Sequence, residues 1–494
     1  MKMKSLLLGS AAGIVAVTGA QAADLPLAEP VEYVQICDTY GAGFFYIPGT
    51  NTCLKIGGYV RVDYNIGALE DSTVRRGAFF DSIEGPPSAT LGTVSGDANI
   101  DEDETFAYIR TSRLDDKSND NLYSWFARGA INFDVRTETE FGTLRAFVQY
   151  FGNFTSTSDA AQPVLADKAF VQLAGFTFGL TQSFFDAPYA SYVQPYVSED
   201  TTTNVLAYTA TFGNGFSATL SMEDGVQRRG IATSSLIAIE TGDFGRQAYA
   251  GTRWPDLVAA LRVSQGWGSF QLSGALHQNR VRDELDTGAL GNTAFEEFDE
   301  DWGYAVQANL RVNVPMIGNN SFVWANAAYG EGAHSYVTGG GPKQGLASLG
   351  FNPWYTVADV YANYDDFGSD GVDQGKAWSL TGGASVGIMP GITLRGTASY
   401  ARFDDLYWIG GGEDINGSIG SIDAFQGVLG AIWTPVAGLD IGLEVVYDRL
   451  DVNLSGSGID QLEDVFGEDP SDGLGRMSGA EDAWTGRLRV QRNF

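Results

Sequence analysis

The sequence offers few side chains suited to catalysis, and this scarcity narrows the chemistry. Only two histidines occur: His277 lies on the polar face of a predicted strand and is expected to line an interior, and His334 lies in a long connection. Neither belongs to a recognisable nucleophile–base motif. The two cysteines, Cys37 and Cys53, are too few to hold zinc without nearby histidines. We therefore predict no catalytic residue, no metal site and no cofactor.

Arginine is the charged residue whose placement is most regular. Arginines recur at polar positions of alternating segments near both ends of the chain. A guanidinium stays charged at any working pH and presents a rigid fork of donors. The sequence thus predicts a basic wall, although each arginine could instead pair with a neighbouring acid and only fill space. The six arginines are Arg61, Arg128, Arg136, Arg145, Arg487 and Arg489.

Alternation of polar and apolar residues is the element-level pattern that positions these arginines. In segment 55–64, Tyr59, Arg61 and Asp63 share one face, while Val60 and Val62 share the other. This period of two is typical of a strand with one polar and one apolar face. It recurs about sixteen times, in segments 55–64, 123–136, 143–150, 166–174, 176–185, 204–212, 216–224, 256–266, 268–281, 302–314, 321–332, 376–389, 391–403, 423–436, 439–453 and 482–494.

The connections between these segments alternate in length. Short turns occur near 137–141, 174–175, 213–215, 266–268, 315–320, 389–391 and 437–438. Long polar stretches occupy 65–121, 225–250, 333–375 and 454–481. Short turns on one rim and long loops on the other are typical of an outer-membrane β-barrel. A soluble sandwich or propeller also has many strands, but it would not require so many aromatics near strand ends.

An all-β, transmembrane, antiparallel β-barrel of about sixteen strands is therefore the predicted fold. After the first two dozen residues, no apolar run is long enough for a membrane helix, which needs roughly 20 residues. In a closed barrel the last strand pairs with the first, so the six arginines should share one wall.

The N-terminus is typical of a secretory signal. Lys2 and Lys4 precede the apolar stretch 6–17, and residues 20–22 read Ala-Gln-Ala, a small-x-small cleavage pattern. We predict a signal peptide over 1–22, and a single barrel domain over 23–494 whose segment 23–52 precedes the first strand. A single membrane anchor is the alternative. Export permits a disulfide between Cys37 and Cys53, although two free thiols are the competing interpretation.

The chain is strongly acidic, with a formal net charge of −31, which argues against nucleic acid as a partner. Acidic residues cluster in predicted outer loops, at 101–104, 296–301, 463–464 and 468–469. These clusters are either solvated loop surface or places where divalent cations bridge the protein to lipopolysaccharide, because hard oxygen ligands suit Ca²⁺ and Mg²⁺.

The stretch after the signal resembles a known family. Residues 31–38 read Val-Glu-Tyr-Val-Gln-Ile-Cys-Asp, residues 40–50 read Tyr-Gly-Ala-Gly-Phe-Phe-Tyr-Ile-Pro-Gly-Thr, and Thr-Cys-Leu-Lys-Ile-Gly-Gly-Tyr-Val-Arg follows at 52–61. This is similar to the N-terminus of the alphaproteobacterial general porins of rhizobia and brucellae. The terminal Phe494 is similar to the assembly signal of outer-membrane proteins. The resemblance implies a sixteen-stranded homotrimer whose third loop folds into the lumen.

By strand count, the third long connection is 186–200. Its acids Asp186, Glu199 and Asp200 would face the arginines across the lumen and create a transverse field. Its tyrosines would pack on the wall or offer a track for sugars. An ordinary solvated surface loop is the alternative. The tyrosines are Tyr189, Tyr192 and Tyr196.

These patterns predict a passive, water-filled diffusion channel for ions and small hydrophilic solutes in the bacterial outer membrane. A solute-specific channel is one alternative, and a plugged barrel that acts through its outer loops is another. An enzyme is disfavoured because no nucleophile has a partner base. Ion selectivity does not follow from net charge, since loop acids are screened beyond a Debye length of about 8–10 Å.

Overall fold

The computed structural model describes most of the chain. The third connection is described only at its two ends, up to Asp186 and from Thr201. The described residues are 36–68, 123–155, 164–186, 201–233, 251–282, 298–338, 355–365, 368–408, 417–466 and 478–494.

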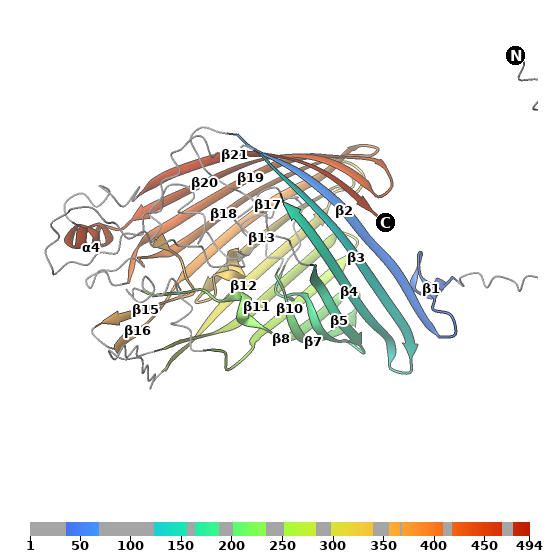
Figure 1. Ribbon diagram of the computed structural model, residues 1–494, viewed down its shortest axis with the longest axis horizontal. Helices are drawn as coiled ribbons and strands as arrows, with labels where there is room; N and C mark the ends of the chain where they lie inside the picture. The colour runs from blue at the N-terminus through green and yellow to red at the C-terminus, as the bar shows by residue number, and fades with distance from the viewer. Residues whose placement is uncertain are drawn as a thin grey trace, which may run out of the picture.

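Sixteen strands of the described residues form a closed antiparallel barrel (Figure 1). Closure comes from the pairing of β2 with β21, in which Asp63 lies opposite Arg489. All sixteen predicted strands are present. They are β2 (Thr52–Ala68), β3 (Tyr123–Thr139), β4 (Gly142–Thr155), β5 (Leu165–Leu173), β6 (Phe176–Gln182), β7 (Thr202–Gly213), β8 (Phe216–Glu223), β10 (Asp256–Gln265), β11 (Gly268–Arg282), β12 (Phe298–Asn313), β13 (Phe322–Glu331), β17 (Lys376–Met389), β18 (Ile392–Trp408), β19 (Ser418–Val436), β20 (Leu439–Leu454) and β21 (Gly479–Asn493).

Short turns join the strands at one end of the barrel, as the sequence predicts. Between β5 and β6 the turn consists of Ala174 and Gly175, with φ of 50° and 89°. Two successive residues of positive φ give a primed hairpin turn, whose twist matches that of the flanking strands. The long connections leave the opposite end, where the helix α4 (Gly456–Phe466) lies in Figure 1.

The outward face of the wall is apolar and the inward face is polar. On β11, Leu272 and Leu276 are exposed, while their neighbours Ser273 and His277 are buried. This is the reverse of a water-soluble protein, in which large apolar side chains are buried. It is the arrangement that a barrel in a hydrocarbon layer requires. None of the described helices is long and apolar enough to cross a membrane.

The segment before β2 is tied to the short-turn end of the barrel. A disulfide joins Cys37 to Cys53, which confirms the predicted bond. The short strand β1 (Phe45–Tyr46) pairs with β2, with Phe45 opposite Leu54. The 3₁₀ helix η2 (Asp38–Tyr40) precedes it. The chain end also closes on β2, because the backbones of Gly58 and Phe494 exchange two hydrogen bonds of 3.0 and 3.1 Å.

Parts of two long connections enter the barrel interior, and the two connections pair with each other. The first holds the 3₁₀ helix η3 (Gly225–Arg228) and β9 (Ile231–Thr233), and the second holds helix α2 (Ser335–Thr338), β14 (Tyr355–Thr356), β15 (Val360–Asp365) and β16 (Gly368–Gln374). Strand β9 pairs in parallel with β15, so both connections contribute to one three-stranded sheet. Parts of this second connection pack in an apolar core with inward residues of β17–β20, such as Phe403 and Ile422.

Candidate functional site

The six predicted arginines lie on four neighbouring strands, β21, β2, β3 and β4 (Figure 1). Strand alternation turns them to the same side as the buried Asp63 and Asp134, which is the barrel interior. Two pairs lie directly opposite each other across strands: Arg61 faces Arg128, and Arg136 faces Arg145. We call this interior face of β21, β2, β3 and β4 the arginine side.

Asp63 is the acid at the centre of the arginine side. Arg489 holds both of its carboxylate oxygens, through Nε at 2.7 Å and Nη2 at 2.6 Å. Arg61 is a more distant partner, with Nε 3.7 Å from Oδ2. Next along the strands, Nε of Arg487 donates to Asn65 at 2.8 Å. A bidentate pair of this kind fixes the guanidinium and uses most of the acceptor capacity of the acid.

Asp134 is the second acid, and two arginines share it. Arg136 and Arg145 each donate two hydrogen bonds to its carboxylate, at distances of 2.8–3.0 Å. Arg136 also lies over the rings of Phe44 and Tyr40, at 4.9 and 5.6 Å. The segment before β2 is therefore held to this wall by cation–π contacts in addition to its disulfide.

Arg128 has no acidic partner among the described residues. Its Nε donates to Asn153 at 2.6 Å, and its guanidinium lies over the rings of Phe151 and Phe126 at 4.1 and 5.3 Å. The guanidinium of Arg61 lies over Phe126 as well, at 4.9 Å. Both cations therefore contact the same aromatic ring.

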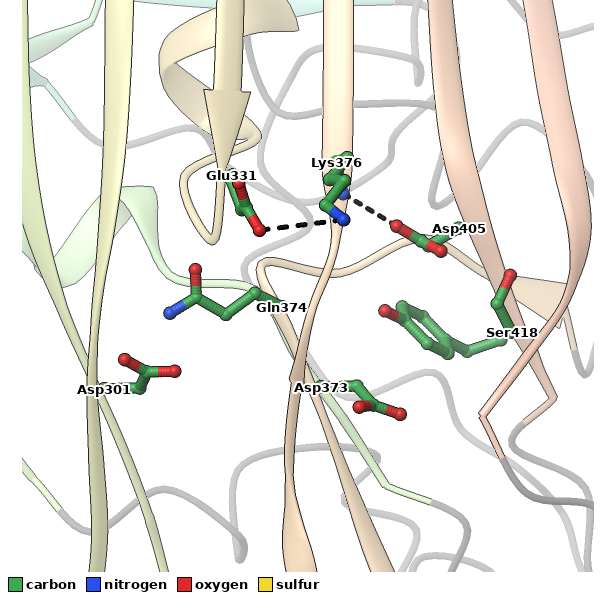
Figure 2. Close-up of a pocket in the computed structure, with 8 residues that line it drawn as sticks. Asp301, Glu331, Asp373, Gln374, Lys376, Asp405 and Ser418 are labelled. Atoms are coloured by element: carbon green, nitrogen blue, oxygen red, sulfur yellow. Dashed lines mark hydrogen bonds and ion pairs between the residues drawn. The ribbon is translucent and has the colours of Figure 1, made fainter.

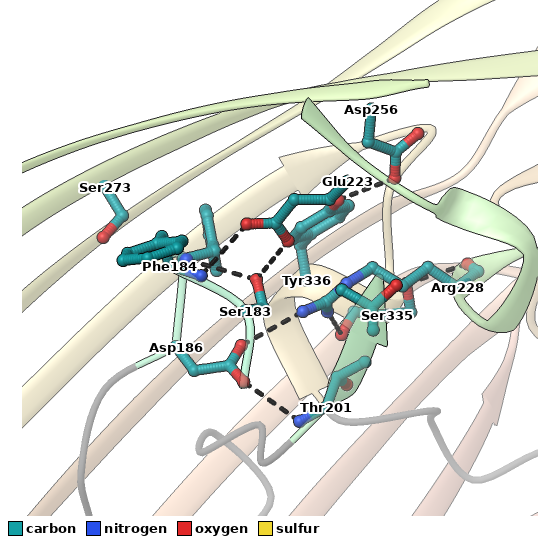
Figure 3. Close-up of polar contacts among 12 residues, drawn as sticks. Ser183, Phe184, Asp186, Thr201, Glu223, Arg228, Asp256, Ser273, Ser335 and Tyr336 are labelled. Atoms are coloured by element: carbon teal, nitrogen blue, oxygen red, sulfur yellow. Dashed lines mark hydrogen bonds and ion pairs between the residues drawn. The ribbon is translucent and has the colours of Figure 1, made fainter. Parts of the chain in front are cut away.

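The third connection begins inside the barrel (Figure 3). Asp186 is buried, and its carboxylate accepts hydrogen bonds from Arg228 at 3.1 Å and from the N–H of Thr201 at 3.0 Å. The two residues that flank segment 187–200 therefore lie side by side. Its cation partner is Arg228 of the next connection, a residue that the sequence prediction did not include. The other predicted residues, Tyr189, Tyr192, Tyr196, Glu199 and Asp200, lie outside the described residues.

Glu223, at the end of β8, holds the same connection from the wall. It accepts hydrogen bonds from the hydroxyl of Ser183 at 2.6 Å and from the N–H of Phe184 at 3.0 Å (Figure 3). From β11, Gln271 donates to the carbonyl of Asp186 at 3.1 Å. The base of the third connection is thus bound to two wall strands that are distant in sequence.

Tyr336 of helix α2 closes this cluster. Its ring lies 3.9 Å from the guanidinium of Arg228, and its hydroxyl donates to Asp256 at 2.6 Å. Burial raises the pKa of Tyr336 well above its ordinary value, so the hydroxyl keeps its proton. His277 contacts the same carboxylate through Nδ1, at 2.8 and 2.9 Å. His277 faces the interior as predicted, but Tyr336 and Asp256 cover it, so it does not line open water.

We call this region the filled side: the interior face of β8, β10, β11 and β12, covered by residues 183–186, 225–228 and 333–338. Its charged groups were missed by sequence reasoning. Arg228 and Tyr336 lie in long connections with no motif around them, and their partners are 42 and 80 residues away. Only the alternation that turns Glu223, Asp256 and His277 inward was visible in the sequence.

A polar pocket of about 600 Å³ lies at the loop end of the wall (Figure 2). Within it, Nζ of Lys376 is 3.7 Å from Glu331, and the backbone N–H of Lys376 donates to Asp405 at 3.0 Å. The hydroxyl of Tyr304 donates to Glu331, which places this rim of the pocket on the outward face. The lining residues are Asp301, Glu331, Asp373, Gln374, Lys376, Asp405, Tyr407 and Ser418.

The acidic residues of this pocket are relevant to the hypothesis that divalent cations bridge the outer loops to lipopolysaccharide. In the described part of the chain, no three acidic, histidine or cysteine side chains converge to hold one metal ion. Of the predicted acidic stretch 296–301, Glu300 pairs with Arg253 and Arg280 at 2.8 Å each, and Asp301 lines the pocket. The stretches 101–104 and 468–469 lie outside the described residues.

Known proteins match the chain over most of its length. The family model described as the porin subfamily matches residues 24–477. Porin Omp2b of Brucella suis is 29% identical over 86% of this chain and 99% of its own length, and Omp2b of Brucella melitensis biotype 1 is 28% identical over 82% and 93%.

A solved structure supports the fold. The outer membrane channel DcaP of Acinetobacter baumannii matches with a TM-score of 0.51 at 17% identity, over 91% of this chain and 99% of that one. The inward polar face, the closed sixteen-stranded wall and the family match agree with one another. The chain therefore belongs to the porin subfamily and forms a passive channel in the outer membrane.

Proposed function

We propose that ions and small hydrophilic solutes cross this porin along the arginine side. The observation that carries this proposal is the contrast between the two sides of the interior. On the filled side, Arg228 and Asp186 keep only 1% and 0% of their side-chain surface. On the arginine side, Arg61 keeps 18% and Arg145 keeps 28%. Water reaches the second set, and a solute path requires water.

The third connection is proposed to narrow this path. Its two described ends, Asp186 and Thr201, are hydrogen-bonded to each other inside the barrel. A loop that starts in the interior is suited to form a constriction opposite the arginines. The same contacts support the competing function, a plugged barrel that acts through its outer loops, and the sheet shared by β9 and β15 also favours it.

Single-channel conductance in a planar bilayer tests the proposal. We expect large, long-lived current steps from the purified mature chain, without saturation at high solute concentration. Absent conductance would favour the plugged barrel. Small, saturable conductance would favour a solute-specific channel. We also propose that the channel has no catalytic activity, because the buried His277 is engaged by Asp256.

A homotrimer is proposed because part of the wall is short. Strand β6 has seven residues and β8 has eight, whereas β19 has nineteen. Seven residues tilted by about 40° span roughly 18 Å, less than the apolar band of about 25 Å. Contact with a second copy would cover this wall, including the exposed Phe176 and Phe178. A native mass of three chains in detergent is expected, and a monomer would contradict it.

Two further proposals concern export and the lipid surface. Cleavage after Ala22 would release a mature chain beginning at Ala23, which intact-mass measurement of the membrane protein tests directly. The acidic pocket at the outer rim is proposed to contact lipopolysaccharide through shared divalent cations. Its support is the outward carboxylate of Glu331, which lies beside the exposed Tyr304.

A further inference from the structure

We propose that Arg61 and Arg128 form a binding station for a tetrahedral oxyanion such as phosphate, and that the channel prefers anions although the chain carries a net charge of −31. This inference rests on the proposed path along the arginine side. It adds the class of solute that this path favours.

The two arginines lie where like charges ordinarily destabilise a sheet. They are directly opposite each other on β2 and β3, and both turn inward. Both guanidiniums lie within 5.3 Å of the ring of Phe126. Directly opposed like charges are unfavourable in a sheet unless a counter-charge compensates them.

A second pair on the same wall shows what compensation looks like. Arg136 and Arg145 are also directly opposite each other, but both donate to Asp134 at 3.0 Å or less. The shared carboxylate offsets their repulsion, so this pair has little remaining positive charge to attract an anionic solute.

Arg61 and Arg128 have no shared acid among the described residues. The nearest carboxylate, Asp63, is held on both oxygens by Arg489, and it lies 3.7 Å from Nε of Arg61. That Nε is buried and makes no hydrogen bond within the described chain. Among the described residues, Arg128 donates only to the uncharged Asn153. This part of the wall therefore carries positive charge that no described acid fully compensates.

The geometry of the donors selects the kind of anion. Each guanidinium presents a planar fork that matches two oxygens of a phosphate or carboxylate. One carboxylate can serve two forks, as Asp134 does for Arg136 and Arg145, but a phosphate group carries more acceptor oxygens and more negative charge than a carboxylate, so it suits two uncompensated cations better. We therefore assign phosphate-like groups to this station. Acids in the outer loops do not cancel the local field, because they are screened over a Debye length of about 8 Å.

The test is the reversal potential of the purified full chain in a planar bilayer under a KCl gradient, followed by addition of phosphate or acetate. For the wild type we expect a reversal potential of anion-selective sign, and a larger fall in chloride current with phosphate than with an equal concentration of acetate. A charge roughly 6 Å from an ion in a water-like medium changes the local ion concentration about threefold. Arg61→Gln with Arg128→Gln should therefore lower the anion preference several-fold and abolish the phosphate effect.

Two comparison variants keep the proposal falsifiable. Arg262→Gln with Arg311→Gln removes two inward arginines from β10 and β12 and should leave the phosphate effect intact. Arg61→Lys with Arg128→Lys keeps the charge and should keep the anion preference, but it should weaken the phosphate effect because the forks are lost.

A conducting wild-type channel with cation preference, or with equal phosphate effects in all variants, would overturn the station and leave the porin function intact. Absence of any conductance would overturn the proposed function itself, and the station with it.

Discussion

The two sides of the barrel interior contain the same residue types, arginine and acidic residues, but these residues have different roles on each side. On the filled side, Arg228 pairs with Asp186 and lies on Tyr336, and the contact joins three connections into one buried unit. On the arginine side, Arg61 and Arg128 belong to the wall and keep contact with water. An arginine bound by a buried acid stabilises a structure, whereas one without its own acid is available to a solute.

The difference has an energetic consequence. Breaking a buried ion pair leaves a charge without solvent or partner, while a cation that faces water is solvated whether or not it is paired. Substitutions on the filled side should therefore affect stability and channel noise. Substitutions on the arginine side should mainly affect which ions pass.

The largest effect is expected from Arg228→Met. This change leaves the buried carboxylate of Asp186 without its cation and should lower the free energy of unfolding by about 3–5 kcal/mol. Thermal unfolding in detergent and single-channel current noise measure it. The neighbouring Arg229→Met is the matched control and should change stability far less. Equal losses of stability from the two substitutions would contradict the conclusion that the buried contacts of the filled side stabilise the protein.

Removal of the disulfide should cause the next largest loss of stability, and this loss should be confined to the segment before β2. A crosslink across 16 residues contributes about 3 kcal/mol in the chain-entropy model. Cys37→Ser with Cys53→Ser should expose the segment before β2 to protease and leave the conductance of the barrel unchanged. A loss of conductance would show that this segment supports the pore itself.

Arg489→Met is the counterpart of Arg228→Met on the arginine side. Arg489 holds Asp63 with two charge-assisted bonds, and this pair keeps slightly more solvent contact (7% and 4% of the side-chain surface) than Arg228 and Asp186 (1% and 0%), so we expect a smaller cost of about 1–3 kcal/mol. Unfolding in detergent of both variants, Arg489→Met and Arg228→Met, gives the ratio of the two losses in the free energy of unfolding. A cost on the arginine side that exceeds the one on the filled side would reverse the comparison.

Chelation should have the smallest effect. The described acids of the outer rim do not converge on one metal ion, so a chelator should change stability by less than about 1 kcal/mol, and only when lipopolysaccharide is present. Thermal unfolding with and without lipopolysaccharide tests this, with Asp301→Asn as the control. A large shift in detergent alone would indicate a metal site within the protein.

The sequence predicted the wall well because the signal for a strand is local. Alternation within ten residues is enough to place β11 or β21, and closure then puts Arg487 and Arg61 on neighbouring strands. The disulfide was predictable because the chain has only two cysteines. The filled side was not predictable, since the pairing of Asp186 with Arg228 and of Asp256 with Tyr336 depends on how connections pack inside the closed barrel.

His277 shows, at a single residue, what strand alternation cannot predict. Alternation correctly turned it inward, but inward is not the same as exposed to water. Helix α2, which covers it through Tyr336, lies 58 or more residues further along the chain and has no sequence feature that marks it as an interior segment. Strand patterns thus report the face of a side chain and not its solvation.

Cysteine accessibility tests the central claim most directly, because the two native cysteines are paired and leave no free thiol in the described chain. Ser124→Cys places a thiol on the arginine side, and Ser273→Cys places one on the filled side. With a charged thiol reagent added during single-channel recording, we expect stepwise current loss for Ser124→Cys and no change for Ser273→Cys. Current loss at Ser273→Cys together with none at Ser124→Cys would contradict a solute path along the arginine side.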